Sequence, residues 1–241
     1  MFNPHPKIQQ IALPGRAPVV VLDDALLDPE GLRAYALSHR EAFSRPAHNA
    51  YPGRELRMPD AFSAQLDDAF RLHARAALGA RRTLAMYSRL SMVTLRPDQL
   101  QPGQSICHQD RLLVQGGDRV RGHELVAASV LYLFDDPRLG GTSFFAPTRA
   151  PAEVARLMAD TGRLDPEAFE RQYGIAQAYM TRSNAYFQRL ATVPARFNRL
   201  IFYDASVFHS GHIDHPALLS EDLAQGRLTL NGFFTCSRAA Q

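Results

Sequence analysis

The sequence from about residue 84 onward alternates between short apolar runs and turn residues, and this pattern constrains the fold more than any other feature of the chain. Strand-like runs cover residues 84–95, 105–110, 125–134, 135–145, 197–211 and 226–237. Short strands at this spacing are typical of a β-sandwich or a barrel. We therefore predict a β-rich core over residues 83–241.

Helical patterns precede this core and interrupt it. Residues 28–43 form an expected helix with Asp28 as N-cap and Pro29 at its first position. A second amphipathic helix is expected over 61–78, and a helical insert around 151–180. With the buried strand expected over 17–26, these elements indicate an α+β protein.

Domain organisation follows from what the chain lacks. No repeat or shift in composition marks a boundary, so we expect one domain over 1–241, in which segment 1–82 packs on the core. Residues 44–60 are rich in Pro, Gly and polar side chains. We expect a long loop there, and loops of that length tend to be functional.

The composition favours a soluble globular protein, with 46% hydrophobic and 21% charged residues. The net charge of +3 is spread along the chain, so we expect no nucleic-acid partner. Cys107 and Cys236 are too few for a disulfide framework. Without a signal peptide or a membrane-spanning run, we expect a cytoplasmic protein with no membrane partner. No pattern indicates an oligomeric state.

The candidate chemistry begins with His108 and Asp110, which share one face if their segment is extended. His209 ends an apolar run far downstream and can complete a set of two imidazoles and one carboxylate. This set is typical of non-haem Fe(II) oxygenases, which leave metal positions open for a co-substrate and dioxygen. Cys107 points to the opposite side and is expected in the core.

Two features compete with this interpretation. A His-x-Asp sequence often occurs without a metal. The downstream cluster His212, Asp214 and His215 could also contribute to a zinc site made of His209, His212 and His215. We favour a solvated turn for this cluster, because histidines that follow a strand are commonly exposed.

Arg227 and Thr229 lie two residues apart on a predicted strand and therefore share one face. A buried guanidinium offers a planar fork for a carboxylate, and a neighbouring hydroxyl adds a donor. The pair suits the distal carboxylate of a dicarboxylic acid. The alternative is a structural ion pair of Arg227 with Asp204 or Glu221.

The order of these parts resembles the Fe(II)/2-oxoglutarate-dependent oxygenase superfamily, whose core is a double-stranded β-helix of jelly-roll or cupin-like type. The segments 3–8, 51–55, 198–213 and 226–234 resemble more closely an uncharacterised bacterial family of that superfamily, known as a domain of unknown function. The resemblance spans nearly the whole chain. In one departure, the segment 211–226 places Arg227 further from His209 than in many members.

The resemblance implies that His108, Asp110 and His209 bind Fe(II). It also implies that Arg227 binds 2-oxoglutarate, with Thr229 assisting, and that the Tyr132 hydroxyl meets the same carboxylate. Because halogenating members have a small residue at the carboxylate position, Asp110 favours hydroxylation.

The expected substrate is a small molecule or a peptide. Arg111 follows the metal motif directly and could contact the substrate near the metal. Gly140 and Gly141 are expected to form a tight turn. The rival functions are a cupin-like metalloenzyme without 2-oxoglutarate and a non-catalytic binding protein.

Overall fold

The protein is described by a computed structural model over residues 1–45, 50–110 and 124–238. These ranges contain ten strands, four α-helices and short 3-10 turns. The strands are β1 (Lys7–Ile11), β2 (Val19–Asp23), β3 (Gly53–Arg57), β4 (Ala80–Val93), β5 (Glu124–Tyr132), β6 (Gly141–Pro147), β7 (Phe187–Val193), β8 (Arg199–Asp204), β9 (Phe208–His212) and β10 (Arg227–Arg238). The helices are α1 (Pro29–Ser38), α2 (Asp60–His73), α3 (Pro151–Asp160) and α4 (Pro166–Tyr173).

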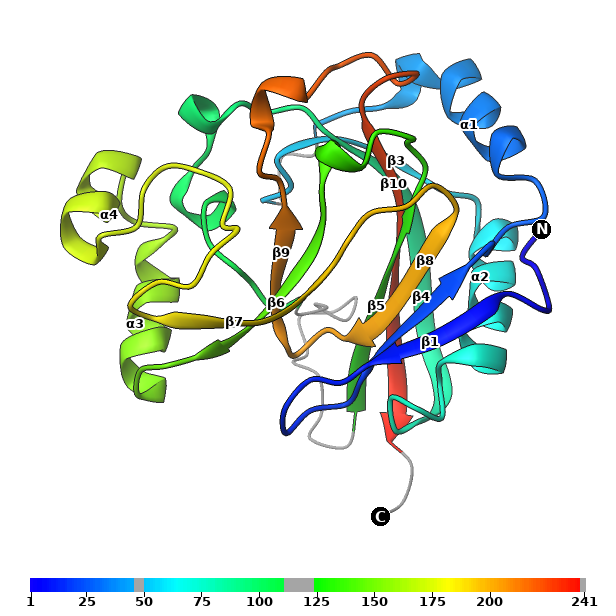
Figure 1. Ribbon diagram of the computed structural model, residues 1–241, viewed down its shortest axis with the longest axis horizontal. Coiled ribbons are helices and arrows are strands. Elements are labelled where there is room, and N and C mark those ends of the chain that lie inside the picture. The colour runs from blue at the N-terminus through cyan, green and yellow to red at the C-terminus, as the bar shows by residue number, and fades with distance from the viewer. Residues whose placement is uncertain (46–49, 111–123, 239–241) are drawn as a thin grey trace.

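The strands form two antiparallel sheets (Figure 1). The larger sheet has the order β1-β2-β8-β5-β10-β4-β3, and the smaller has the order β7-β6-β9. Strands that are consecutive in the chain alternate between the sheets at β5 to β6 and at β8 to β9. This is the predicted α+β architecture with a double-stranded β-helix core, and the fold prediction is confirmed.

Alternation of side chains along the strands divides the interior into layers. Leu200 and Phe202 of β8 belong to the cluster that packs the larger sheet on α1 and α2. Ile201 and Tyr203, on the opposite face of β8, belong to the cluster between the two sheets. A third cluster packs α3 and α4 on the smaller sheet, and Figure 1 shows these helices beside β7, away from α1 and α2.

The predicted helices are present, but α1 ends at Ser38 and α2 ends at His73, each five residues before the predicted ends at 43 and 78. The Asp28 carboxylate accepts a hydrogen bond from the Gly31 amide at 2.8 Å, so α1 begins at Pro29 as expected. Helix α2 buries Leu66 and Phe70. The insert between β6 and β7 consists of α3 and α4. No helix in the described ranges combines the length and apolar character needed to span a bilayer.

Two local predictions were wrong. Residues 44–60 are not one long loop, because the segment Gly53–Arg57 pairs with β4 as an edge strand. Gly53 lies so close to the backbone of Met92 that a Cβ there would collide with it, so this glycine serves strand pairing. Residues 105–110 are not a regular strand, because only His108 forms a β-bridge, to His209.

Asp23 and Arg199 form an ion pair that connects the ends of β2 and β8. Arg199 Nε lies 2.7 Å from Asp23 Oδ1, and Nη2 lies 3.0 Å from Oδ2. Hydrogen bonds from Arg199 lower the pKa of Asp23 below its ordinary value of 3.8, against the effect of burial. This stabilisation is present above the ordinary pKa of the unfolded chain and is lost as the pH falls through the lower folded value.

We expect Asp23→Asn to lower the free energy of unfolding by about 2–4 kcal/mol at pH 7, because it leaves Arg199 buried without its counter-charge. Urea denaturation at pH 7 and at about pH 3 measures the effect, and the difference from wild type should shrink at the lower pH. The control is Asp24→Asn, which removes an exposed pair with Lys7 and should cost less than about 1 kcal/mol. An equal decrease in the free energy of unfolding in Asp23→Asn and Asp24→Asn would contradict the prediction.

Candidate metal and co-substrate site

His108 and His209 are brought together by backbone pairing. The His108 amide donates to the His209 carbonyl at 2.9 Å, and the His209 amide donates back at 2.9 Å. His209 lies on β9, which pairs with β6, whereas His108 lies on an irregular segment that β9 holds through this bridge. The two imidazole ring centroids are 4.6 Å apart.

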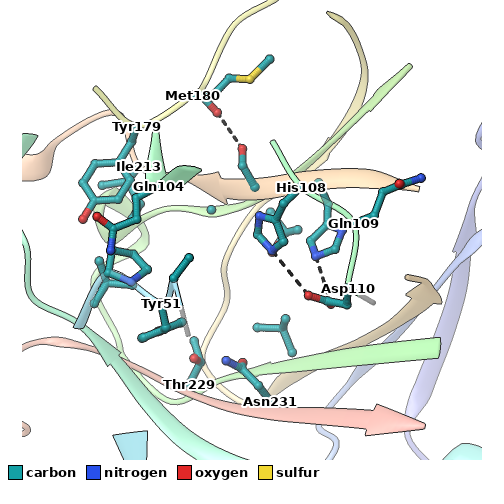
Figure 2. A pocket seen from close by; sticks show the side chains of 18 of the residues that line it. Tyr51, Gln104, His108, Gln109, Asp110, Tyr179, Met180, Ile213, Thr229 and Asn231 are labelled. Carbon is teal, nitrogen blue, oxygen red and sulfur yellow. Dashed lines mark hydrogen bonds and ion pairs between the residues drawn. The ribbon is translucent and has the colours of Figure 1, made fainter. Parts of the chain in front are cut away.

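Asp110 completes the cluster. Its amide donates to the Ala205 carbonyl at 3.1 Å, which anchors the segment at the turn between β8 and β9. Asp110 Oδ1 lies 3.5 Å from His108 Nε2, and Asp110 Oδ2 lies 3.2 Å from His209 Nε2. One potential ligand atom from each residue lies within 4.8 Å of the others, and Figure 2 shows His108 directed toward Asp110. The structure thus brings together the three predicted metal ligands.

The protonation of the cluster suits a cation. His209 Nδ1 lies 2.9 Å from the Val207 carbonyl, so Nδ1 carries the proton and Nε2 keeps its lone pair toward Asp110. Burial opposes ionisation of Asp110, but the facing imidazoles outweigh it and hold its pKa well below the usual range. Burial likewise opposes protonation of His209, but Asp110 raises the pKa of that imidazole. A buried negative charge and imidazole nitrogens therefore converge on one point.

Arg227 is buried at the start of β10, with 5% of its surface exposed. Its Nε donates to the carbonyls of Leu139 and Gly140 at 3.0 and 3.3 Å, and Nη2 donates to the Gly141 carbonyl at 2.9 Å. These bonds hold the guanidinium without neutralising it. No described carboxylate lies within ion-pair distance of Arg227, and a buried charge of this kind needs a counter-ion.

The structural ion pairs considered for Arg227 are not formed. Glu221 instead contacts Arg54 and Arg45, at 3.0 and 3.5 Å. Asp204 accepts a hydrogen bond from the Ser206 amide at 2.8 Å. The charge of Arg227 is therefore available to an anionic ligand.

The turn that holds Arg227 requires glycine. Gly140 has a φ of 87°, and a Cβ at this position would collide with the His212 backbone. The predicted tight turn is thus confirmed at Gly140. The carbonyl groups of Leu139, Gly140 and Gly141 in this turn also orient the Arg227 guanidinium.

Thr229 and Tyr132 flank Arg227 differently. Thr229 lines the same cavity and donates to the Ser91 carbonyl at 3.3 Å. The Tyr132 hydroxyl lies 2.8 Å from Thr142 Oγ1, and Thr142 is the one of these two that lines the cavity. Burial raises the pKa of Tyr132. Its direct contact with a co-substrate stays a prediction.

A cavity of about 380 Å³ contains the metal cluster, Arg227 and Thr229. In Figure 2 the cluster lies at one side and Tyr51 and Tyr179 lie at the other, with Thr229 and Asn231 along the sheet below. Burial raises the pKa of Tyr51 to about 12, against the effect of the Arg227 charge. The Tyr179 hydroxyl donates to the Leu95 carbonyl at 2.6 Å.

Sequence reasoning did not assign either tyrosine. Tyr51 lies in the segment 44–60, which was expected to be a functional loop, and in the segment 51–55 that carries the family resemblance, whereas nothing in the sequence marked Tyr179. Arg111, expected near the metal, lies outside the described residues.

The downstream histidine cluster does not form a metal site. His212 Nε2 lies 2.8 Å from Asp214 Oδ2, and His212 Nδ1 lies 2.8 Å from Ser143 Oγ. Within the described ranges, the set His108, Asp110 and His209 is the one group of three or more such ligands with this geometry. The zinc site of His209, His212 and His215 is therefore not assembled. Cys107 is buried in the core, as predicted.

The fold is that of the Fe/2-oxoglutarate-dependent oxygenases. One similar structure is the non-heme alpha ketoglutarate dependent carbocyclase SnoK from nogalamycin biosynthesis, with 14% identity, a TM-score of 0.51, and coverage of 90% of this chain and 79% of that chain. Another is HygX from Streptomyces hygroscopicus with iron bound, with 15% identity, a TM-score of 0.50, and coverage of 91% and 82%.

The chain itself belongs to DUF6445, a family of unknown function, whose profile matches residues 4–234. The predicted resemblance to an uncharacterised family is confirmed. No curated protein matches the chain in sequence.

Proposed function

We propose that this protein is an Fe(II)- and 2-oxoglutarate-dependent oxygenase that hydroxylates a small molecule or a peptide. The observation that carries the proposal is that one cavity contains both the His-Asp-His cluster and a buried arginine without a described carboxylate partner. These two features match the two ends of a metal-chelating dicarboxylate.

The donor set fits iron. His108, Asp110 and His209 would bind one face of Fe(II) and leave positions for 2-oxoglutarate and dioxygen. The hydrogen bond between His209 and Val207 keeps the imidazole in the tautomer that binds metal. When iron and 2-oxoglutarate are bound, they supply the oxidation of a substrate C–H bond by dioxygen, with conversion of 2-oxoglutarate to succinate and carbon dioxide.

The remaining residues would bind and orient the co-substrate. Arg227, held by three carbonyl groups, would receive the distal carboxylate in a preorganised position. Thr229 and Tyr51 would add hydroxyl contacts. Tyr132 would act through Thr142 as a positioning residue. Asp110 supplies a carboxylate at the position where halogenating members of the superfamily have a small residue, and this carboxylate favours hydroxylation over halogenation.

Anaerobic reconstitution with Fe(II) and 2-oxoglutarate tests the proposal. We expect a visible charge-transfer absorption that needs both components, and admission of air should then release succinate and carbon dioxide in equal amounts. Failure of the iron-loaded protein to bind 2-oxoglutarate would favour a cupin-like metalloenzyme. Binding without succinate release would favour a binding protein. The cytoplasmic location and the absence of a nucleic-acid partner stay predictions.

A further inference from the structure

The cavity continues beyond the proposed 2-oxoglutarate site along β10. Arg227, Thr229, Asn231 and Phe233 alternate on the cavity side of this strand, and all four line the cavity. In the sheet register, Asn231 lies opposite Arg89 of β4. The proposed function assigns Arg227 and Thr229, but it leaves Arg89 and Asn231 without a role.

Arg89 is a preoriented cation in the cavity wall. Its Nη1 donates to Glu55 Oε2 at 3.0 Å, and its guanidinium lies over the Phe233 ring at 4.6 Å. The side chain is 20% exposed, so it is largely desolvated, and Arg89 lines the cavity. Within the described residues its Nη2 makes no hydrogen bond, so one edge of the fork remains available to a ligand.

Asn231 offers an acceptor that the protein does not satisfy. The residue is 9% exposed, and its buried Oδ1 has no hydrogen-bond partner among the described residues. Figure 2 shows Asn231 between Thr229 and Asp110, beside the metal cluster. Buried polar atoms are normally paired, so an orphaned acceptor in a cavity wall indicates a contact made by a ligand.

With the amide in this orientation, Asn231 Oδ1 needs a donor, and 2-oxoglutarate at neutral pH carries only acceptor oxygens, so 2-oxoglutarate does not satisfy this atom. The contact requires a second molecule with an N–H or O–H group. The same molecule would present an anion to Arg89 Nη2. Glu55 already offsets most of the Arg89 charge, which suits a singly charged carboxylate better than a phosphate.

We propose that Arg89 and Asn231 form the substrate-recognition site, and that the substrate is a 2-amino or 2-hydroxy carboxylic acid. Arg89 binds the carboxylate and Asn231 accepts from the neighbouring donor. This inference rests on the proposed function, because it assumes that 2-oxoglutarate occupies the part of the cavity at Arg227.

The test uses the full chain loaded with Ni(II) and saturating 2-oxoglutarate, which blocks the Arg227 site without turnover. The probes are the standard L-amino acids, the corresponding 2-hydroxy acids and the primary amide of each acid. A thermal-shift screen selects binders, and titration calorimetry measures them. We expect at least one acid to bind and its amide to bind about tenfold or more weakly. If the amino acids bind more tightly than the 2-hydroxy acids, the donor to Asn231 is an amino group; the reverse preference identifies a hydroxyl group.

Variants assign the contacts. Arg89→Met combined with Glu55→Gln removes the cation without leaving a buried carboxylate, and it should weaken the selected acid about tenfold or more. Asn231→Leu should also weaken it. The control Arg82→Met removes an exposed arginine at the far end of β4 and should bind the acid as wild type does.

Separate titration of 2-oxoglutarate distinguishes the two proposals. If wild-type protein binds 2-oxoglutarate but no acid of the panel, the substrate inference is wrong and the proposed function stands. If 2-oxoglutarate does not bind, the proposed function fails. Unchanged affinity for the acid in the Arg89 or Asn231 variant would overturn the role of that residue.

Discussion

His209→Ala is expected to abolish stoichiometric iron binding. The substitution removes a ligand whose orientation the Val207 carbonyl fixes and whose Nε2 faces Asp110 at 3.2 Å. Loss of an outer hydrogen-bond partner already costs a metal site about 10–100-fold in affinity. Loss of one of three protein ligands should cost more. Metal analysis after anaerobic loading and desalting measures the effect, and the charge-transfer absorption with 2-oxoglutarate should disappear with the iron.

The matched control is His212→Ala, three residues further along the same strand end. Because His212 is engaged by Asp214 and Ser143, its loss should leave iron content unchanged. Circular dichroism and thermal melting establish that both variants are folded. If His209→Ala kept iron and His212→Ala lost it, the downstream cluster would be the metal site and the proposed triad would be wrong.

Arg227→Met is expected to separate co-substrate binding from metal binding. Iron should remain, because the guanidinium contacts no metal ligand, whereas 2-oxoglutarate should bind about 100-fold more weakly, equivalent to roughly 3 kcal/mol. The physical reason is that the distal carboxylate would enter a desolvated pocket without a positive charge. Titration of 2-oxoglutarate into the Ni(II)-loaded variant measures this affinity without turnover.

Glu221→Gln serves as the control for Arg227. It removes the carboxylate that could have paired with Arg227, but Glu221 contacts Arg45 and Arg54 at the surface, so affinity for 2-oxoglutarate should be unchanged. An unchanged affinity in Arg227→Met would instead assign Arg227 to holding the turn at Gly140, and the anionic end of the co-substrate would have to bind elsewhere.

The site residues that could be predicted share a simple local signal. His108 with Asp110, and Arg227 with Thr229, are pairs two residues apart, and a spacing of two places side chains on one face of extended backbone. Both pairs line the cavity as expected. The segment around His108 nevertheless lacks regular strand structure, so its side chains converge because the bridge to His209 holds the backbone extended.

The residues that were missed depend on distant neighbours. Tyr51 and Tyr179 are ordinary aromatic residues in sequence, and they line the site because β3 joins the sheet edge and the chain after α4 returns over the cavity. Arg89 lies in the predicted strand-like run 84–95, and nothing in the sequence marks it. Its significance comes from Glu55, Phe233 and Asn231, which lie on two neighbouring strands.

The amino-acid pattern alone is sufficient for the starts of the helices, the alternation of strand faces and the set of candidate metal ligands, because capping and side-chain alternation act over a few residues. It is insufficient for the edge strand β3 and, among the described residues, for the absence of a carboxylate partner of Arg227 and of a donor to Asn231 Oδ1. Those features exist only once backbone pairing has excluded water and set which charges and polar atoms remain without a partner.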